Sequence, residues 1–285
     1  MNHRLFVPNP RWVTQGPVPL LVALHGCTQT AADFATGSRF DIVAERLGAY
    51  VLYPEQTLRA NPRRCWSWYV RKNHVRATGE PAAILELVEQ TCKRYPIDRT
   101  KIFVAGPSAG GIMAAILAEQ APDVFAAAGI AASVPLHAGY DIPSGLRAMK
   151  AKVPEEIITR ISELAPYPRE AYRHQRVTIW TGAEDKLVDP RNSVLVARQF
   201  LGLYGVDSSR MTVESRTGAE VTRWRDADGV VRVELWRVLS CGHLWSGGSF
   251  RGSHTYPAGP PCSDEMMAFF LAGMPQRAEL EAPPR

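Results

Sequence analysis

The sequence predicts an α/β fold built on a doubly wound, mostly parallel sheet with helices on both faces. Two observations support this prediction. Short apolar runs alternate with amphipathic stretches along the chain, and this order is typical of repeated strand–helix–strand units. The first run, Leu20–Leu24, is apolar throughout, as expected of a parallel strand that is covered on both faces.

The remaining elements follow in the same alternating order. The further strands are expected at Tyr50–Tyr53, Lys101–Ala105, Ala126–Ala131, Val177–Trp180 and Val230–Leu239. The helices are expected at Ser38–Leu47, Pro81–Tyr95, Ala109–Glu119 and Ser193–Phe200. Ser38 is expected to cap the first helix and Gly48 to end it. Asp228-Gly229, before the last strand, favours a hairpin turn.

The stretch 138–176 fits the alternation less well and predicts an insertion. Glu155 and Glu156 precede isoleucine and leucine residues at helical spacing up to Leu164, which predicts one amphipathic helix. We expect the insertion to cover the core, with a lid over a site as the alternative. Residues 1–274 are expected to form one domain, and the polar, proline-rich tail 275–285 to be disordered.

Composition and charge exclude several classes of protein. The chain has 285 residues, 46% hydrophobic and 21% charged, with a net charge of +5, which is ordinary for a globular protein. It contains no apolar run long enough to span a membrane, and its first ten residues show no signal peptide. The basic residues between Arg63 and Arg76 are interpreted as a solvated face. No nucleic-acid-binding motif accompanies them.

A candidate nucleophile lies at the junction of a strand and a helix. Gly106-Pro107-Ser108-Ala109-Gly110 matches the pattern G-x-S-x-G. The apolar strand before it and the helix after it are the setting that a nucleophile elbow requires. Glycines on both sides of Ser108 let the strand and the helix pass closely. The alternative is a serine that only caps a helix in an ordinary loop.

A serine nucleophile needs a base and an acid that orients the base. In this class of fold both follow the serine, the acid first. His243 follows the last strand in a glycine-rich loop and is the predicted base, with His254 as the alternative. Asp185 follows the strand that ends at Trp180 and is the predicted acid, ahead of Asp189 and Glu184.

The negative charge that develops on the substrate oxygen needs two N–H donors. The backbone N–H of Ala109, directly after the nucleophile, is one candidate. The loop after the first strand supplies the other, and there the N–H of Cys27 follows Gly26. His25, in the same loop, is interpreted as a structural histidine.

These residues together make the chain resemble the esterase family of polyhydroxybutyrate depolymerases, from about Leu5 to Leu271. The matching stretches are Pro19–Gln29, Cys65–Trp68, Pro96–Asp98, Gly106–Gly111, Gly182–Asp185 and Gly242–Gly248. The resemblance implies the α/β-hydrolase fold. It also implies a triad of Ser108, Asp185 and His243, an oxyanion hole at Cys27 and Ala109, and no metal or cofactor.

The five cysteines show no C-x-x-C spacing, so the residues alone predict neither a zinc site nor a redox pair. Cys92 lies on the apolar face of an expected helix and is interpreted as a buried thiol. The other four could form two disulfides. The family resemblance implies a Cys27–Cys65 bond, and we expect Cys241 to pair with Cys262.

Three tryptophans are expected near a substrate cleft, two of them through the disulfide that the resemblance implies. A Cys27–Cys65 bond would bring Trp66 and Trp68 beside the cleft, and Trp245 follows the predicted base. The alternative role of all three is core packing, because tryptophan serves both purposes.

The implied function is hydrolysis of carboxylic esters through an acyl-enzyme, with poly- or oligo-(3-hydroxyalkanoates) as substrates. A feruloyl or acetylxylan esterase is the main alternative. Acyl transfer to another alcohol, or a non-catalytic binding module on the same fold, are the alternatives of other classes. The family resemblance implies secretion, and because no signal peptide is seen, a cytoplasmic location is the alternative. The sequence does not indicate an oligomeric state.

Overall fold

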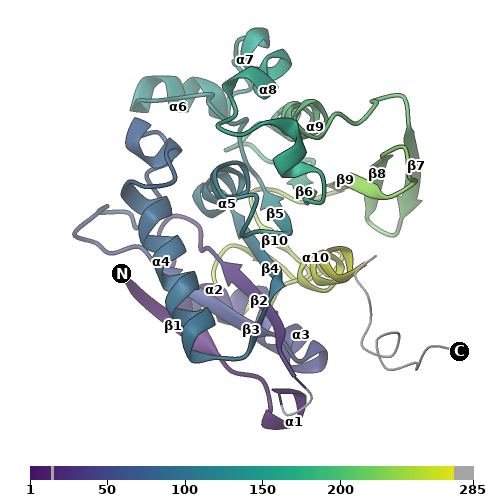
Figure 1. Ribbon diagram of the computed structural model, residues 1–285. Coiled ribbons are helices and arrows are strands. Elements are labelled where there is room, and N and C mark those ends of the chain that lie inside the picture. Colours follow the sequence, from purple (N-terminus) through teal and green to yellow (C-terminus); the bar gives the residue numbers. More distant parts are fainter. Residues whose placement is uncertain (14–15, 273–285) are drawn as a thin grey trace, which may run out of the picture.

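The computed structural model describes residues 1–13 and 16–272, and a nine-stranded sheet crosses this part of the chain (Figure 1). The strand order is β1-β3-β2-β4-β5-β6-β9-β8-β7. Their bounds are β1 Asn2–Phe6, β2 Val18–Ala23, β3 Tyr50–Glu55, β4 Ile97–Pro107, β5 Ala127–Ala131, β6 Arg176–Gly182, β7 Met211–Arg216, β8 Ala219–Arg225 and β9 Val231–Val238. From β3 to β9 all neighbours pair in parallel, whereas β1, β8 and β7 join by antiparallel pairing. The predicted doubly wound, mostly parallel sheet is confirmed.

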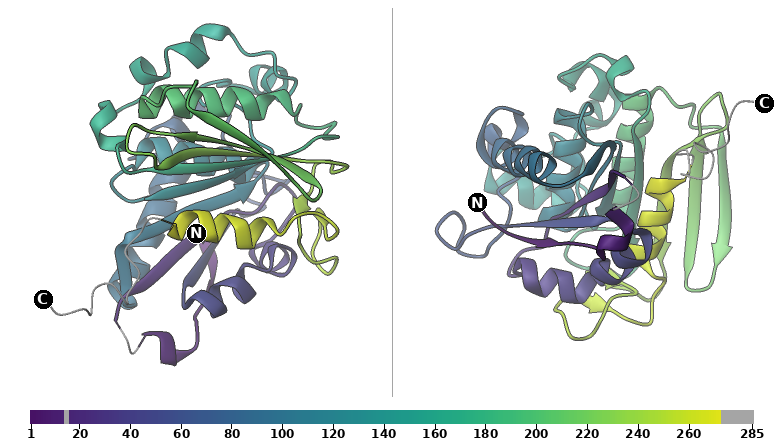
Figure 2. Two further views of the ribbon diagram at one scale, coloured as in Figure 1. Left: turned by 90° about the vertical axis from the view of Figure 1, so that its right-hand side faces the viewer. Right: turned by 60° about the horizontal axis from the view of Figure 1, so that its bottom comes forward.

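Helices cover both faces of this sheet (Figure 2). On one face lie α4 (Gly79–Arg94), α5 (Ala109–Gln120) and α9 (Arg191–Tyr204), and on the other lie α2 (Ala31–Ser38), α3 (Phe40–Leu47) and α10 (Cys262–Leu271). The shorter elements are α1 (Pro10–Val13), the 3-10 turns η1 (Arg71–His74) and η2 (Arg169–Tyr172), and the paired strands β10 (Trp245–Ser246) and β11 (Thr255–Tyr256). No helix of the described residues is both long and apolar enough to cross a membrane.

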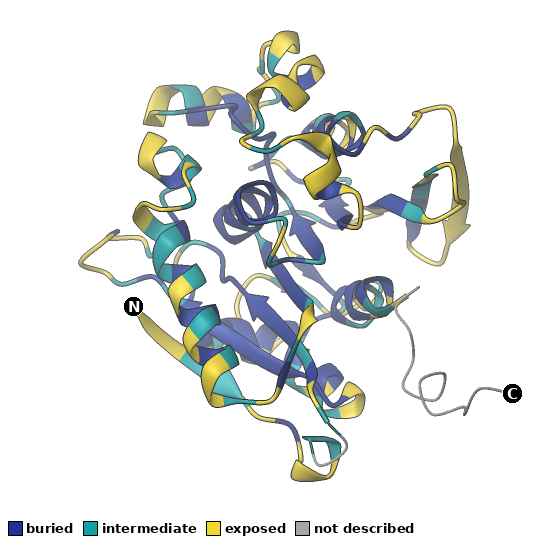
Figure 3. Ribbon diagram, in the orientation of Figure 1, coloured by how far each residue is buried: buried dark blue, intermediate teal, exposed yellow. Residues whose placement is uncertain are grey.

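The continuous apolar run of β2 is explained by its place between two cores. Leu20, Val22 and Leu24 pack into the core under α4, α5 and α9. Leu21 and Ala23 pack into the core under α2, α3 and α10. Helix α5 is buried along its whole length (Figure 3). This burial fixes the N-terminus of α5, and with it Ser108, against the sheet.

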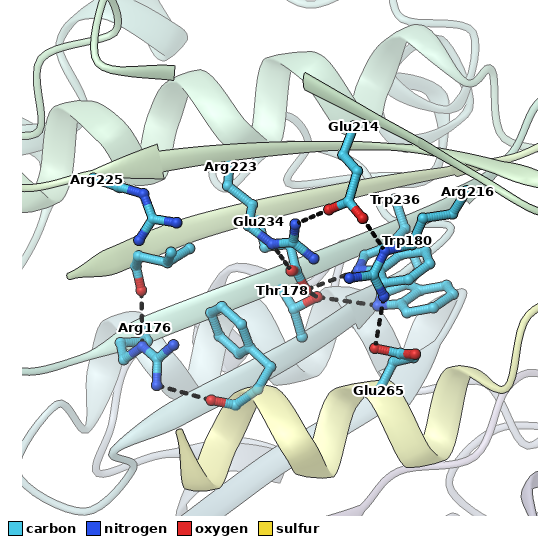
Figure 4. Close-up of polar contacts among 12 residues, drawn as sticks. Arg176, Thr178, Trp180, Glu214, Arg216, Arg223, Arg225, Glu234, Trp236 and Glu265 are labelled. Atoms are coloured by element: carbon cyan, nitrogen blue, oxygen red, sulfur yellow. Dashed lines mark hydrogen bonds and ion pairs between the residues drawn. The ribbon is translucent and has the colours of Figure 1, made fainter. Parts of the chain in front are cut away.

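Polar contacts attach the two outer strands, β7 and β8, to the rest of the sheet (Figure 4). Glu234 on β9 is buried and accepts hydrogen bonds from Thr178 Oγ1 at 3.0 Å and Trp236 Nε1 at 2.8 Å. It also accepts one from Arg223 Nε of β8 at 2.7 Å. Arg223 in turn bonds Glu214 of β7 at 2.6 Å. Donors on β6, β8 and β9 thus satisfy the buried carboxylate of Glu234.

The first predicted helix begins later than expected. Ser38 is the last residue of α2, and α3 begins at Phe40. Arg39 between them adopts a left-handed conformation with φ of 61°, which interrupts the helical backbone. The expectation that Ser38 caps one helix up to Leu47 was therefore wrong. Gly48 ends α3 as predicted, with φ of 65°.

The insertion 138–176 is built from short helices and not from one amphipathic helix. It contains α6 (Ile142–Met149), α7 (Glu155–Thr159) and α8 (Ile161–Leu164). The break between α7 and α8 falls at Arg160, whose ψ of 19° is not helical. Helices α7 and α8 pack on α9. The tail 275–285, which was expected to be disordered, lies outside the described residues.

Candidate active site

Ser108 lies at a strained turn between β4 and α5. Its φ of 54° and ψ of −125° fall in a region that non-glycine residues rarely occupy. Its N–H donates to Ala131 O at 2.8 Å, which anchors the turn to β5. A Cβ at Gly106 or Gly110 would come within 2.4 Å and 2.3 Å of Leu24 O. Only glycine at these two positions lets the turn approach the loop after β2.

Asp185 and His243 form a hydrogen-bonded pair at the carboxyl ends of β6 and β9. His243 Nδ1 lies 2.7 Å from Asp185 Oδ2. The other carboxylate oxygen, Oδ1, accepts from the N–H groups of Leu187 at 2.8 Å and Val188 at 2.9 Å. The Asp185 side chain is fully buried, whereas that of His243 is 19% exposed. Because a carboxylate can only accept, His243 must carry its ring proton on Nδ1 and donate it to Asp185. Nε2 is then left as an acceptor.

Close approach of two loops makes this pair possible. Parallel pairing of β6 with β9 ends at Gly182 and Val238, and Glu184 N then donates to Cys241 O at 2.9 Å. A Cβ on Gly182 would lie 2.2 Å from Gly242 O. A glycine at the end of β6 therefore allows the acid loop and the histidine loop to pack against each other.

The alternative acids and base make different contacts from those of Asp185 and His243. Asp189 is paired with the Arg191 guanidinium at 2.6 Å and accepts from Arg191 N at 3.0 Å. Its negative charge therefore lies beside the N-terminus of α9, which favours it. Glu184 is exposed. His254 is exposed and lines the same cavity as Ser108 and His243. Its Nε2 lies 3.3 Å from Thr28 Oγ1, and no carboxylate of the described residues bonds its ring.

The loop that carries Cys27 is held by buried polar contacts. Gly26 N donates to Gln29 Oε1 at 2.9 Å. His25 Nδ1 lies 2.8 Å from Gly26 O, and Nε2 accepts from Gln56 N at 3.1 Å. Burial lowers the pKa of His25, so its ring is neutral and its contacts fix the loop. His25 therefore has the structural surroundings expected from the sequence.

One cavity of about 620 Å³ brings the predicted site residues together. Its lining includes Ser108 and His243, and Cys27 and Ala109 with them. Asp185 does not line it, because its side chain is buried behind His243. The N-terminus of α5, which favours negative charge, opens onto this cavity at Ala109.

The three tryptophans divide between the cavity and the core. Trp68 and Trp245 line the cavity. Trp66 does not, so its prediction as a cleft residue was wrong. Its side chain is completely buried, and its Nε1 donates to His25 O at 3.0 Å. Trp66 therefore supports the loop beneath the cavity.

The cysteine predictions have two different outcomes. A disulfide joins Cys27 to Cys65, as the family resemblance implied. Cys241 and Cys262, which were expected to pair, are free thiols in buried positions. The Sγ of Cys241 is turned toward Gly242 O, at 3.6 Å. Burial raises the pKa of Cys241 to about 11 and that of Cys262 well above its usual value, so both sulfurs are packed as neutral thiols. Cys92 is also free, but only partly buried.

Helix α6 was not predicted, although it lies in the stretch 138–176, for which a lid over a site was the alternative expectation. Ile142, Gly145, Leu146 and Met149 of this helix all line the cavity. The signal was present at Asp141, which accepts from Ser144 N at 2.7 Å in a capping box. An Asp followed three residues later by Ser is a weaker form of the usual helix-start pattern.

Comparisons with known proteins agree with this geometry. The family described as "Esterase PHB depolymerase" matches residues 2–223. The chain belongs to this family. Poly(3-hydroxyalkanoate) depolymerase C of Paucimonas lemoignei is 30% identical over 79% of this chain and 54% of its own length. Probable acetylxylan esterase A of Aspergillus fumigatus is 28% identical over 75% of this chain and 58% of its own. The chain spans about half the length of these relatives.

Solved structures share the fold at low sequence identity. An acetyl xylan esterase from Aspergillus awamori superposes with a TM-score of 0.68 at 22% identity, covering 94% of this chain and 93% of that one. An S-formylglutathione hydrolase from Agrobacterium tumefaciens gives a TM-score of 0.57 at 17% identity, covering 94% and 88%. The α/β-hydrolase fold that the resemblance implied is confirmed.

Proposed function

We propose that this chain is a serine esterase that hydrolyses carboxylic esters through an acyl-enzyme. One observation carries the proposal. His243, paired with the buried Asp185 at 2.7 Å, lines the same cavity as Ser108 at its strained turn. A nucleophile, a base and an acid that orients the base are the parts that acyl transfer needs.

Each residue has a defined role in the proposed reaction. Asp185 holds the proton of His243 on Nδ1, so that Nε2 accepts the Ser108 proton as Oγ attacks the ester carbonyl. The backbone N–H groups of Cys27 and Ala109 donate to the oxyanion, each contributing about 3 kcal/mol. His243 then protonates the leaving alcohol. Water hydrolyses the acyl-enzyme by the same proton path, and no step needs a metal or organic cofactor.

The substrate class proposed is poly- or oligo-(3-hydroxyalkanoate) esters. Membership of the family supports it, and so does the cavity lining, in which Ile142, Leu146, Met149 and Leu187 offer apolar contact to an alkyl chain. A feruloyl or acetylxylan esterase is the second candidate. It is favoured by the Aspergillus relative and by the similarity to the acetyl xylan esterase structure.

Replacing Ser108 with alanine tests the mechanism. The change should lower kcat/KM on an activated ester by several orders of magnitude and abolish labelling by a fluorophosphonate. Near wild-type turnover by the variant would show that Ser108 is not the nucleophile. Wild-type rates on 3-hydroxybutyrate oligomers, amorphous polymer, feruloylated sugar and acetylated xylan, measured side by side, would then rank the substrates. Products formed with a competing alcohol would reveal acyl transfer.

A further inference from the structure

The cavity that contains Ser108 has an uneven distribution of charge. Of the described residues that line it, Arg63 alone carries a permanent charge, and none is acidic. Arg63 is exposed and forms no ion pair with any residue in ranges 1–13 and 16–272. A guanidinium that lines a cavity without an internal partner is available to an anionic group of a ligand.

Arg63 differs in this respect from three arginines near it in the sequence. Arg64 is paired with Glu55 at 3.0 Å, Arg76 is paired with Asp123, and the guanidinium of Arg71 lies over the ring of Tyr140. These three guanidinium groups therefore already have partners within the protein. Lys72 and Arg59, like Arg63, form no ion pair among the described residues, but they do not line the cavity. Arg63 is exposed, as the interpretation of the cluster as a solvated face expects, but it also lines the cavity.

The backbone around Arg63 is tied directly to the proposed oxyanion loop. Thr28 N donates to Arg63 O at 2.6 Å, and Arg63 N donates to Asn61 Oδ1 at 2.9 Å. Two residues further on, Cys65 forms the disulfide with Cys27. The loop that presents Arg63 is thus fixed on the residue whose N–H is proposed to bind the oxyanion.

We propose that Arg63 binds a free carboxylate of the substrate, so that the enzyme prefers short oligoesters of hydroxy acids with an ionised carboxyl end. This inference rests on the proposed esterase function. Its chemical basis is that every hydrolysed hydroxyalkanoate ester leaves a new carboxylate on one fragment. A guanidinium matches a carboxylate with two parallel hydrogen bonds. Esters of a neutral sugar offer no such group.

The test compares each substrate with a neutral copy of itself. The substrates are the dimer and trimer of 3-hydroxybutyrate as free acids and as their primary amides, with release of 3-hydroxybutyrate measured by chromatography. The wild type should favour the acids. In Arg63→Gln the ratio of kcat/KM for acid over amide should fall about tenfold, because an exposed charged pair is weaker than a buried one. The loss should appear in KM for the acids, and Arg63→Lys should keep part of the preference.

Arg59→Gln is the matched control, since Arg59 is an exposed arginine of the same loop that does not line the cavity. It should leave the ratio unchanged. Equal losses on acid and amide in Arg63→Gln would mean that Arg63 only positions the loop, and an equal effect of Arg59→Gln would mean a general surface potential. Either result, or an unchanged ratio, overturns the proposal.

Two further measurements complete the test. One distinguishes a uronate from the carboxyl end of a hydroxy acid as the preferred group, and the other distinguishes failure of the Arg63 role from failure of the esterase function. An acetylated glucuronic acid and its amide show whether a uronate is preferred over a hydroxy acid end, and a preference confined to the uronate would overturn the assignment to oligoesters. A wild type that hydrolyses the amides without preferring the acids refutes only the role of Arg63. A wild type that hydrolyses neither and takes no fluorophosphonate label removes both proposals.

Discussion

Replacing Asp185 with asparagine should separate catalysis from stability. Asparagine is nearly the same shape, so its Oδ1 can still accept from the N–H groups of Leu187 and Val188, which lie 2.8 Å and 2.9 Å from the native oxygen. Its NH₂ would then face His243 Nδ1 and force the ring proton onto Nε2. Nε2 could no longer accept the proton of Ser108. We expect kcat to fall by about 10⁴-fold.

The stability of the same variant should change little. Both loop N–H groups keep an acceptor, so we expect a loss of about 1 kcal/mol in the free energy of unfolding. Asp185→Ala leaves both N–H groups without that acceptor and should cost about 2–6 kcal/mol. Activated-ester kinetics and urea unfolding of the two variants measure the two effects. Asp185→Asn with more than a tenth of wild-type kcat would refute the role given to the carboxylate.

Two further predictions concern stability. The Cys27–Cys65 bond closes a loop of sequence separation 38. Replacing both cysteines with serine should lower the free energy of unfolding by about 4 kcal/mol through loop entropy. Urea unfolding measures this, and an unchanged midpoint would contradict it. Burial lowers the pKa of His25 and of His74, and the Nδ1 of His74 has no hydrogen-bond partner among the described residues. The unfolded chain therefore binds these protons first, and stability should fall as pH drops below about 6.5. Unfolding curves between pH 7 and pH 5 check this, and His74→Asn should flatten the slope.

Much of the sheet and the elbow could be predicted because local pattern determines them. Five further strands were expected after Leu20–Leu24, and each overlaps an observed one. The elbow at Ser108 was predictable because the pattern G-x-S-x-G and the apolar strand before it lie within one short stretch of the chain, although the contacts that require its glycines involve the distant Leu24. The outer strands β7 and β8 were not predicted beyond the hairpin turn. Strand β7 is exposed throughout, and β8 buries only Ala219, Val221 and Trp224. Neither sequence keeps the strict apolar alternation that marks a half-buried strand.

Features that depend on distant partners could not be predicted from pattern. Trp66 and Trp68 lie two residues apart, yet one is enclosed by the His25 loop and the other lines the cavity. Nothing in their local sequence distinguishes the two. The same holds for Cys241, whose free thiol depends on how its loop packs. The charge of Arg63 became distinct from that of Arg64 only when Glu55 was found beside the latter.

The outer edge of the sheet has a consequence for how copies of this chain meet. Strand β7 is exposed along its whole length, and an open edge of this kind invites another strand to pair with it. Glu214 and Arg216 bond each other there at 2.9 Å, and Arg216 also reaches Glu265 of α10. An incoming strand would have to strip water from these charges and fit around side chains already held in place. The edge is thereby protected against strand-to-strand aggregation by charges fixed in its own fold.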